Sequence, residues 1–222
     1  MVCVLILAAA AGAVAAFLIL RIWVVLRSRD FTPRESLSIL VVAGSGGHTT
    51  EILRLLGSLS SAYSPRHYVI ADTDEMSANK INSFELDRAD RDPSNMYTKY
   101  YIHRIPRSRE VRQSWPSTVF TTLHSMWLSF PLIHQVKPDL VLCNGPGTCV
   151  PICVSALLLG ILGIKKVIIV YVESICRVET LSLSGKILFH LSDYFIVQWP
   201  ALKEKRRNRK EKILSCSISV YI

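Results

Sequence analysis

A glycine-rich segment, Gly44-Ser45-Gly46-Gly47-His48, is the part of the sequence best suited to chemistry. It follows an apolar, β-branched run at residues 37–43 and precedes leucine and isoleucine residues at helical spacing. Glycines let a backbone adopt positive φ and let a ligand approach closely. Free amides at a helix start, together with the helix dipole, favour an anion such as a pyrophosphate. The pattern therefore predicts an anion-binding loop that uses Ser45, Gly46, Gly47 and Thr49.

Two standard nucleotide-binding loops do not fit this segment. A P-loop needs a lysine after its last glycine, and none is present. The dinucleotide fingerprint GxGxxG needs a third glycine, and Thr49 stands in its place. The segment also has the simpler interpretation of a tight turn between a strand and a helix.

His48 stands at the predicted start of the helix, where the dipole favours a neutral imidazole. A neutral imidazole can take a proton, so His48 is the candidate general base that activates an acceptor hydroxyl. A hydrogen-bonded loop histidine is the structural alternative. Glu51, three residues later, is predicted to complete a capping box.

A second group of polar and glycine residues follows later strands of the predicted sheet. Residues 144–148 read Asn-Gly-Pro-Gly-Thr, and Asp72, Asp74 and Glu173 each follow a predicted strand. Ligands of open parallel sheets collect at the carboxyl ends of the strands. We therefore expect one site with both loops and with Asp74 and Glu173 as candidates for contacting sugar hydroxyls; a turn or cap and an ion pair with Arg177 are their alternatives. The acceptor- or phosphate-binding candidates in the second loop are Asn144, Gly145, Gly147 and Thr148.

Strand-like and helical patterns alternate along residues 37–200. Strands are predicted at residues 37–43, 67–71, 97–105, 139–143, 166–172 and 194–199, with helices after the first loop, at 114–136 and at 149–162. In the helix at 114–136, an apolar stripe from Val119 and Leu123 to Ile133 falls on one face, and Pro131 is expected to end or kink it. The alternation predicts an α/β domain with a Rossmann-like parallel sheet and helices on both faces.

The first 20 residues contain no charged side chain. A helix of residues 2–20 would be roughly 29 Å long, close to the hydrocarbon thickness of a bilayer. A signal peptide would carry its basic residues before the apolar run, whereas Arg21, Arg27 and Arg29 follow it. The sequence therefore predicts one transmembrane helix at residues 1–26, a linker at 27–36, a lumenal N-terminus and a cytosolic domain.

The 222 residues have a net charge of +9, a mean hydropathy of +0.32 and six cysteines without a CxxC pair. The cysteines predict reduced, partly buried thiols and no metal site. The basic run of residues 203–212 has no interleaved aromatic residue, which argues against nucleic-acid binding. It is expected to be a solvated tail, with attraction to anionic lipid headgroups as the alternative.

Several long motifs resemble the eukaryotic asparagine-linked glycosylation protein 14 family. They are LSILVVAGSGGHTTEILRLL, HYVIADTDEMS, KPDLVLCNGPGTCVP, KKVIIVYVESICRVETLSLSGK and YFIVQWP. The resemblance implies the membrane-anchoring, acceptor-side half of a GT-B glycosyltransferase at the endoplasmic reticulum. It implies transfer of the second GlcNAc, in β1,4 linkage, to GlcNAc-pyrophosphoryl-dolichol, with no cofactor and no bound metal. By the same likeness Gly46, Gly47 and His48 fall at the acceptor pyrophosphate.

The resemblance also implies partners. A soluble donor-side subunit, asparagine-linked glycosylation protein 13, would hold UDP-GlcNAc, and the next mannosyltransferase of the pathway would join the assembly. Residues 201–222 form a basic tail, of which residues 206–222 do not resemble the family's C-terminal segment, so the tail is expected neither to add to a sheet nor to dock the partner. A membrane scaffold without chemistry is one alternative function, and a membrane-anchored reductase that uses Asp72 or Asp74 on a ribose is another.

Overall fold

The computed structural model describes residues 2–27, 36–91, 99–110, 113–145, 147–204 and 213–215. Its strands are β1 (Ile39–Val42), β2 (Arg66–Ala71), β3 (Tyr100–Ile105), β4 (Leu140–Asn144), β5 (Ile168–Val172), β6 (Tyr194–Val197) and β7 (Ile213–Ser215). Its helices are α1 (Val2–Arg27), α2 (Gly47–Leu56), α3 (Glu75–Arg91), α4 (Trp115–Val136), α5 (Cys149–Ile161), α6 (Leu183–Leu191) and α7 (Pro200–Glu204).

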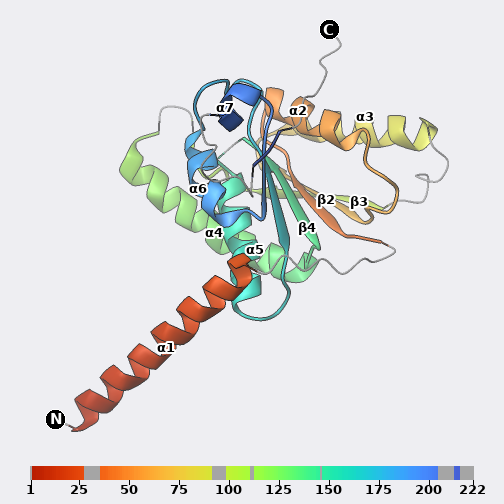
Figure 1. The fold of residues 1–222 in the computed structure, drawn as a ribbon. Coiled ribbons are helices and arrows are strands. Elements are labelled where there is room, and N and C mark those ends of the chain that lie inside the picture. Colours follow the sequence, from red (N-terminus) through yellow and green to blue (C-terminus); the bar gives the residue numbers. More distant parts are fainter. Residues whose placement is uncertain are drawn as a thin grey trace.

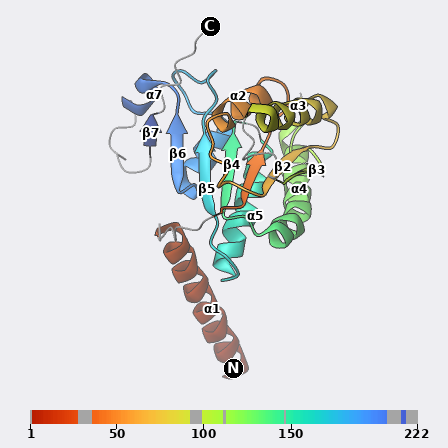
Figure 2. The ribbon, with the colours of Figure 1, turned by 90° about the vertical axis from the view of Figure 1, so that its right-hand side faces the viewer.

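The strands form one parallel sheet in the order β3-β2-β1-β4-β5-β6-β7. All strands point the same way, so the loops that follow them share one edge (Figure 2). The chain order reverses between β1 and β4, and this is the point where ligands of open α/β sheets bind. The topology therefore places both glycine loops beside the switch point of the sheet.

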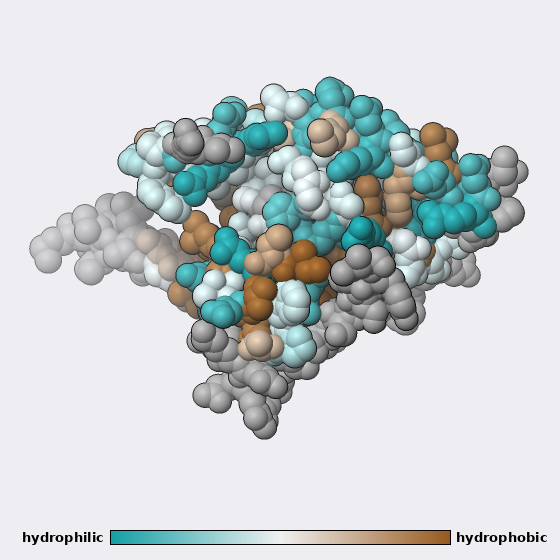
Figure 3. Space-filling model, turned by 90° about the horizontal axis from the view of Figure 1, so that it is seen from above, coloured by the Kyte–Doolittle hydropathy of each residue, from teal (hydrophilic) through white to brown (hydrophobic). Residues whose placement is uncertain are grey.

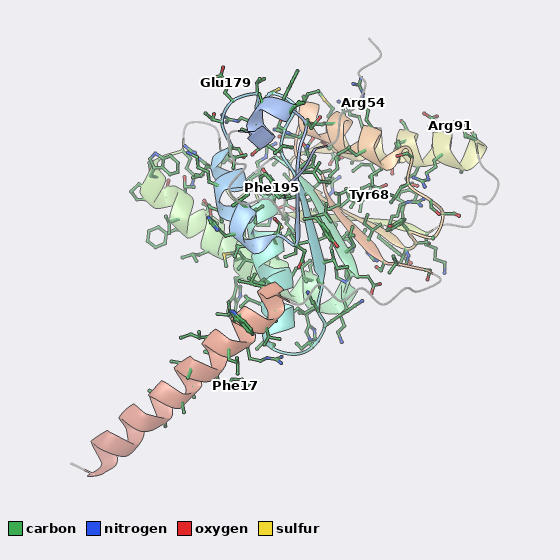
Figure 4. The ribbon with its side chains drawn as sticks, in the orientation of Figure 1. Phe17, Arg54, Tyr68, Arg91, Glu179 and Phe195 are labelled. Carbon is green, nitrogen blue, oxygen red and sulfur yellow. The ribbon has the colours of Figure 1, made fainter. Side chains whose placement is uncertain are left out.

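Apolar side chains cover both faces of the sheet, because alternate residues of a strand point to opposite faces. Leu40, Val42 and Phe195 pack with α4, α5 and α6 on one face, whereas Ile39, Val41 and Tyr68 belong to a second core with α2 and α3 on the other. Figure 1 shows the two helical layers on either side of the strands. Figure 4 labels one aromatic residue from each core, Phe195 and Tyr68. The predicted Rossmann-like parallel sheet with helices on both faces is confirmed.

The predicted elements differ from the observed ones mainly at the C-terminus. The tail was expected not to join a sheet, yet Ile213–Ser215 pairs in parallel with β6, so that expectation is wrong for these three residues. The basic run ends at Lys212, and the strand begins with the β-branched residue that follows it. The linker prediction falls almost entirely on residues 28–35, which lie outside the described residues.

Helix α4 is oriented differently from its predicted stripe. Ile133 is buried, but Val119 and Leu123 are 56% and 55% exposed, and the buried positions in the middle of the helix are Ser125 and Ser129. The small serine side chains let α4 approach its neighbours closely. Because the serines take the inner face, apolar side chains such as Val119 and Leu123 lie on the outer face. The helix does not end at Pro131 but continues to Val136.

Helix α1 packs on the domain through its last turns. The Arg21 Nε donates to the carbonyl oxygen of Ile161 at 3.0 Å and its Nη2 to that of Gly160 at 3.3 Å, so Arg21 caps the C-terminus of α5. The rest of α1 extends away from the domain (Figure 1), and Phe17 projects from this part of the helix (Figure 4). Among the residues that the structure describes, no helix combines the length and apolar character needed to cross a membrane. The transmembrane anchor predicted at residues 1–26 is therefore not confirmed.

Candidate functional site

A cleft of about 390 Å³ opens at the carboxyl edge of the sheet. Its walls come from both glycine loops, from residues 107–110 after β3, and from the adjoining faces of α4 and α6. The view onto this edge in Figure 3 shows hydrophobic side chains exposed between hydrophilic ones. Of the predicted phosphate-binding residues, Ser45, Gly147 and Thr148 line the cleft.

His48 links the two glycine loops. Its Nδ1 lies 3.0 Å from the Oδ1 of Asn144, at the end of β4, and 3.6 Å from the Oε2 of Glu51, one turn along α2. Both neighbours are acceptors, so Nδ1 carries the proton, donates it to Asn144 and faces the carboxylate of Glu51. The lone pair is then on Nε2, which these contacts leave available for a substrate hydroxyl. This is the tautomer that a general base requires.

The electrostatic environment of His48 differs from the sequence prediction. The interaction with Glu51 raises the pKa of His48 above its usual value of 6.5, against burial, which lowers it. The hydrogen bond from His48 and that from the amide of Ile175 outweigh burial and lower the pKa of Glu51. The ionised carboxylate beside the ring therefore makes His48 a stronger base, whereas the sequence prediction considered only the helix dipole.

Glu51 does not form the predicted capping box. The helix N-cap is Gly46, which has no side-chain acceptor, and Glu51 instead faces the loop after β5. Its Oε1 accepts from the amide of Ile175 at 2.7 Å and from the Nε2 of Gln198, which also donates to the carbonyl oxygen of Glu173. Glu51 therefore connects His48 to β5 and β6. The sequence contains no local signal for Gln198, because 147 positions separate it from Glu51 in the chain.

Two glycines in the loops have backbone conformations that only glycine adopts readily. Gly46 and Gly145 both have a φ of 69°. A Cβ on Gly145 would lie 2.5 Å from Cε1 and 2.7 Å from Nδ1 of His48, whereas one on Gly46 or Gly47 would meet no atom within 4 Å. Gly145 therefore provides space for the imidazole, and Gly46 and Gly47 keep space for a ligand.

Two predicted site residues, Thr49 and Asp74, have their side chains elsewhere. Thr49 is buried, and its hydroxyl bonds the carbonyl oxygen of Gly44 and, at 2.6 Å, the hydroxyl of Ser77. Asp74 is buried and caps α3, accepting from the amide of Ser77 at 3.0 Å and from its hydroxyl at 2.7 Å. Neither side chain faces the cleft, so the structure does not support Thr49 as a phosphate contact or Asp74 as a sugar contact.

Glu173 is fully buried beneath the loop that follows β5. Its Oε2 accepts from the amide and hydroxyl of Ser182 at 3.1 and 3.2 Å, and its Oε1 accepts from the amide of Ser174 at 3.2 Å. Its carboxylate is therefore occupied inside the protein, which argues against the predicted sugar contact. It orders the chain between β5 and α6.

Arg107, Arg109 and Trp115 belong to the cleft but were not among the residues predicted from the sequence. The guanidinium of Arg109 lies 4.4 Å from the ring centre of Trp115, and all three residues line the same cleft as the glycine loops. Their signal in the sequence is weak, since the two arginines stand in a polar loop without a motif. Within the described ranges, no cluster of His, Cys, Asp or Glu is suited to a metal ion. Cys143, Cys149 and Cys153 are free and buried, as predicted.

Comparisons with known proteins bear on both the family and the fold of this chain. A family model described as "Oligosaccharide biosynthesis protein Alg14 like" matches residues 39–216, a range that includes β7. A crystal structure of Acinetobacter baumannii MurG has a TM-score of 0.50 and 16% sequence identity, and the likeness covers 74% of this chain and 42% of that chain. This second likeness shows the fold alone, because the sequence identity is only 16%.

Curated relatives are much more similar in sequence. The human UDP-N-acetylglucosamine transferase subunit ALG14 is 96% identical over 205 residues, which cover 92% of this chain and 95% of that protein. The Yarrowia lipolytica protein of the same name is 40% identical over 203 residues, covering 88% of this chain and 92% of that one. The chain therefore belongs to the Alg14 family of oligosaccharide biosynthesis proteins.

Proposed function

We propose that this chain is the acceptor-side subunit of a UDP-GlcNAc transferase that adds the second GlcNAc to GlcNAc-pyrophosphoryl-dolichol. The observation that carries the proposal is the His48 arrangement at the switch point of the sheet. A base with a free Nε2 stands between two glycine loops, one of which offers amides at a helix start for the acceptor pyrophosphate. Membership of the Alg14 family supports the same reaction.

His48 would remove the proton from the acceptor hydroxyl while that oxygen attacks the anomeric carbon and UDP leaves. The described residues contain one α/β domain, whereas transfer between two substrates needs a surface for each. We therefore propose that a soluble donor-side subunit, asparagine-linked glycosylation protein 13, binds UDP-GlcNAc and closes over the carboxyl edge. The word "subunit" in the names of the relatives supports such an assembly.

We further propose that α1 anchors the chain in the endoplasmic reticulum membrane, with the domain on the cytosolic side. Residues 1–20 contain no charged side chain, and Val14, Phe17 and Ile19 are 58% to 67% exposed, so this part of the helix presents apolar side chains to its surroundings. An anchor would keep the cleft near a lipid-linked acceptor. The next mannosyltransferase would meet the product at the same membrane.

One reconstitution tests these proposals together. Membranes that contain this chain, washed with alkaline carbonate, are mixed with the soluble donor-side subunit, UDP-GlcNAc and GlcNAc-pyrophosphoryl-dolichol. We expect the chain to remain in the washed membranes and the product to contain two GlcNAc units. Recruitment of the donor-side subunit without transfer would instead leave a scaffold, and release of the chain by carbonate would contradict the anchor.

A Gly145→Ala change tests the placement of His48. The new Cβ would collide with the imidazole, and φ of 69° would strain the alanine, so the ring must move away from Asn144. We expect kcat to fall by about 10²-fold, since small displacements of a catalytic group have effects of that order. The measurement is kcat in the reconstituted assay.

A double mutant separates this effect from general damage to the loop. If Gly145 acts through His48 alone, Gly145→Ala adds no further loss in a His48→Ala background. Additive losses in the two variants would show that Gly145 has another role in catalysis.

A further inference from the structure

We propose that Arg107 and Arg109 bind the diphosphate of a lipid-linked substrate, and that the apolar row of α4 carries its isoprenoid chain from the cleft to the membrane. This inference rests on the proposed function and extends it, because none of these residues belongs to the glycine loops. It specifies where the lipid of the acceptor lies and which side chains contact it.

The arginines supply the cationic wall of the cleft. Within the described residues, the Nε of Arg107 is buried without a hydrogen-bond partner, which is costly for a guanidinium unless an anion fills the place. Arg109 is held over Trp115 and lines the same wall. Glu110 is the one carboxylate among the lining residues, so the wall keeps a net positive charge. Guanidinium groups match phosphate geometry well, and residues of both glycine loops line the same cleft.

The apolar row begins in the cleft and leaves it along α4. Trp115, Val119, Leu123 and Trp127 follow one another at four-residue spacing, which places them on one face of the helix, and Phe120 lies beside them. They are 55% to 79% exposed. The 22 residues of α4 include no Asp, Glu, Lys or Arg. A solvated helix normally has charges on its outer face, so this face is suited to lipid.

The opposite lip of the cleft is apolar as well. Leu183 and Ile187 of α6 line the cleft and are 53% and 41% exposed. Figure 1 shows α4 and α6 on the same side of the sheet, the side toward which α1 also extends. An isoprenoid that leaves between the two helices would run toward the membrane in which α1 is proposed to lie. A cationic cleft that opens onto an uncharged apolar helix face favours a lipid-linked anion over a protein on this face.

Direct binding tests the arginine wall without any transfer step. The full chain in detergent micelles is dialysed against farnesyl diphosphate, an isoprenyl diphosphate that carries no sugar. We expect Arg107→Gln to weaken binding roughly 10- to 100-fold, the range for a lost charged hydrogen bond, and Arg107→Lys to restore part of it. The matched control is Arg104→Gln, since Arg104 pairs with Glu75 at 2.8 Å and does not line the cleft. Equal affinities for Arg107→Gln and the unchanged protein would overturn the proposal.

A comparison of two ligands tests the apolar row. The paired change Phe120→Ser and Trp127→Ser should lower the ratio of farnesyl diphosphate affinity to pyrophosphate affinity by about ten-fold, because only the first ligand has a chain to bury. Leu86→Ser on α3, which removes another exposed apolar side chain at 65%, should leave the ratio unchanged.

The outcomes distinguish the two proposals. An unchanged ratio together with loss of the donor-side subunit would mean that the α4 face docks a protein, and it would overturn the lipid path. Tight binding of farnesyl diphosphate without GlcNAc transfer would contradict the proposed reaction and leave the lipid site intact.

Discussion

Replacing His48 by alanine is expected to lower the kcat of GlcNAc transfer by about 10²- to 10⁴-fold, the range for loss of a general base. The imidazole is the group between the two loops whose free nitrogen can accept the proton of the attacking hydroxyl. Substrate binding should change much less, because the loop amides remain. The measurement is kcat and KM for both substrates in the reconstituted assay. An unchanged kcat would remove His48 from the reaction and leave it a structural loop residue.

The pH dependence gives a second test of the same residue. Transfer requires neutral His48, so the rate should rise with pH through the pKa of His48, which Glu51 raises above 6.5. In Glu51→Gln the largest cause of that increase is removed, so the pKa falls and the acidic limb of the profile moves to lower pH. The plateau rate should also fall, since the ring loses a neighbour that orients it. An acidic limb at the same pH in both proteins would show that another group is titrating.

Replacing Arg66 by methionine is expected to destabilise the domain by about 3–5 kcal/mol, the usual cost of removing one partner from a buried ion pair. Arg66 is 1% exposed, and its Nε and Nη2 donate to the two carboxylate oxygens of Glu85 at 2.9 and 2.6 Å. The pair joins the start of β2 to α3, and the hydroxyl of Tyr68 donates to the same carboxylate. Without Arg66, the buried carboxylate of Glu85 loses both of its guanidinium hydrogen bonds.

The effect would appear as a lower midpoint of urea unfolding with an unchanged slope. Arg66→Met combined with Glu85→Leu is the control, because it removes both charges and keeps apolar volume. It should regain most of the lost stability, since replacing a buried pair by apolar residues is often close to neutral. A single variant as stable as the unchanged protein would mean that water reaches this pair.

The fold could be predicted because its signals are local. Buried parallel strands appear as continuous β-branched runs, and Ile39–Val42 and Ile168–Val172 both lie within predicted strands. The glycine loops could be placed at one edge because all parallel strands end there. The start and end of a helix follow similar local rules, and α4 and α5 lie within one residue of their predicted bounds at both ends.

The site was only partly predictable, because its decisive contacts join distant residues. Glu51 looked like a capping residue, since the sequence shows its spacing from His48 but not its contacts with Ile175 and Gln198. Asp74 and Glu173 follow strands, as ligand-binding carboxylates often do, but one caps a helix and the other is enclosed by its own loop. The role of Gly145 also depends on a neighbour nearly 100 residues earlier in the chain.

The contact between α1 and the end of α5 has a mechanical consequence. Arg21 binds two carbonyl oxygens of α5, and a Cβ on Gly160 would lie 3.0 Å from Val25, so the joint is close-fitting as well as hydrogen-bonded. These contacts fix the angle between α1 and the domain. For an α1 embedded as proposed, the tilt of α1 in the membrane therefore sets the height of the cleft above the lipid and the direction in which it faces. The cleft would then lie at a fixed distance from the membrane surface, and that distance would have to match the reach of the diphosphate group of a lipid-linked substrate.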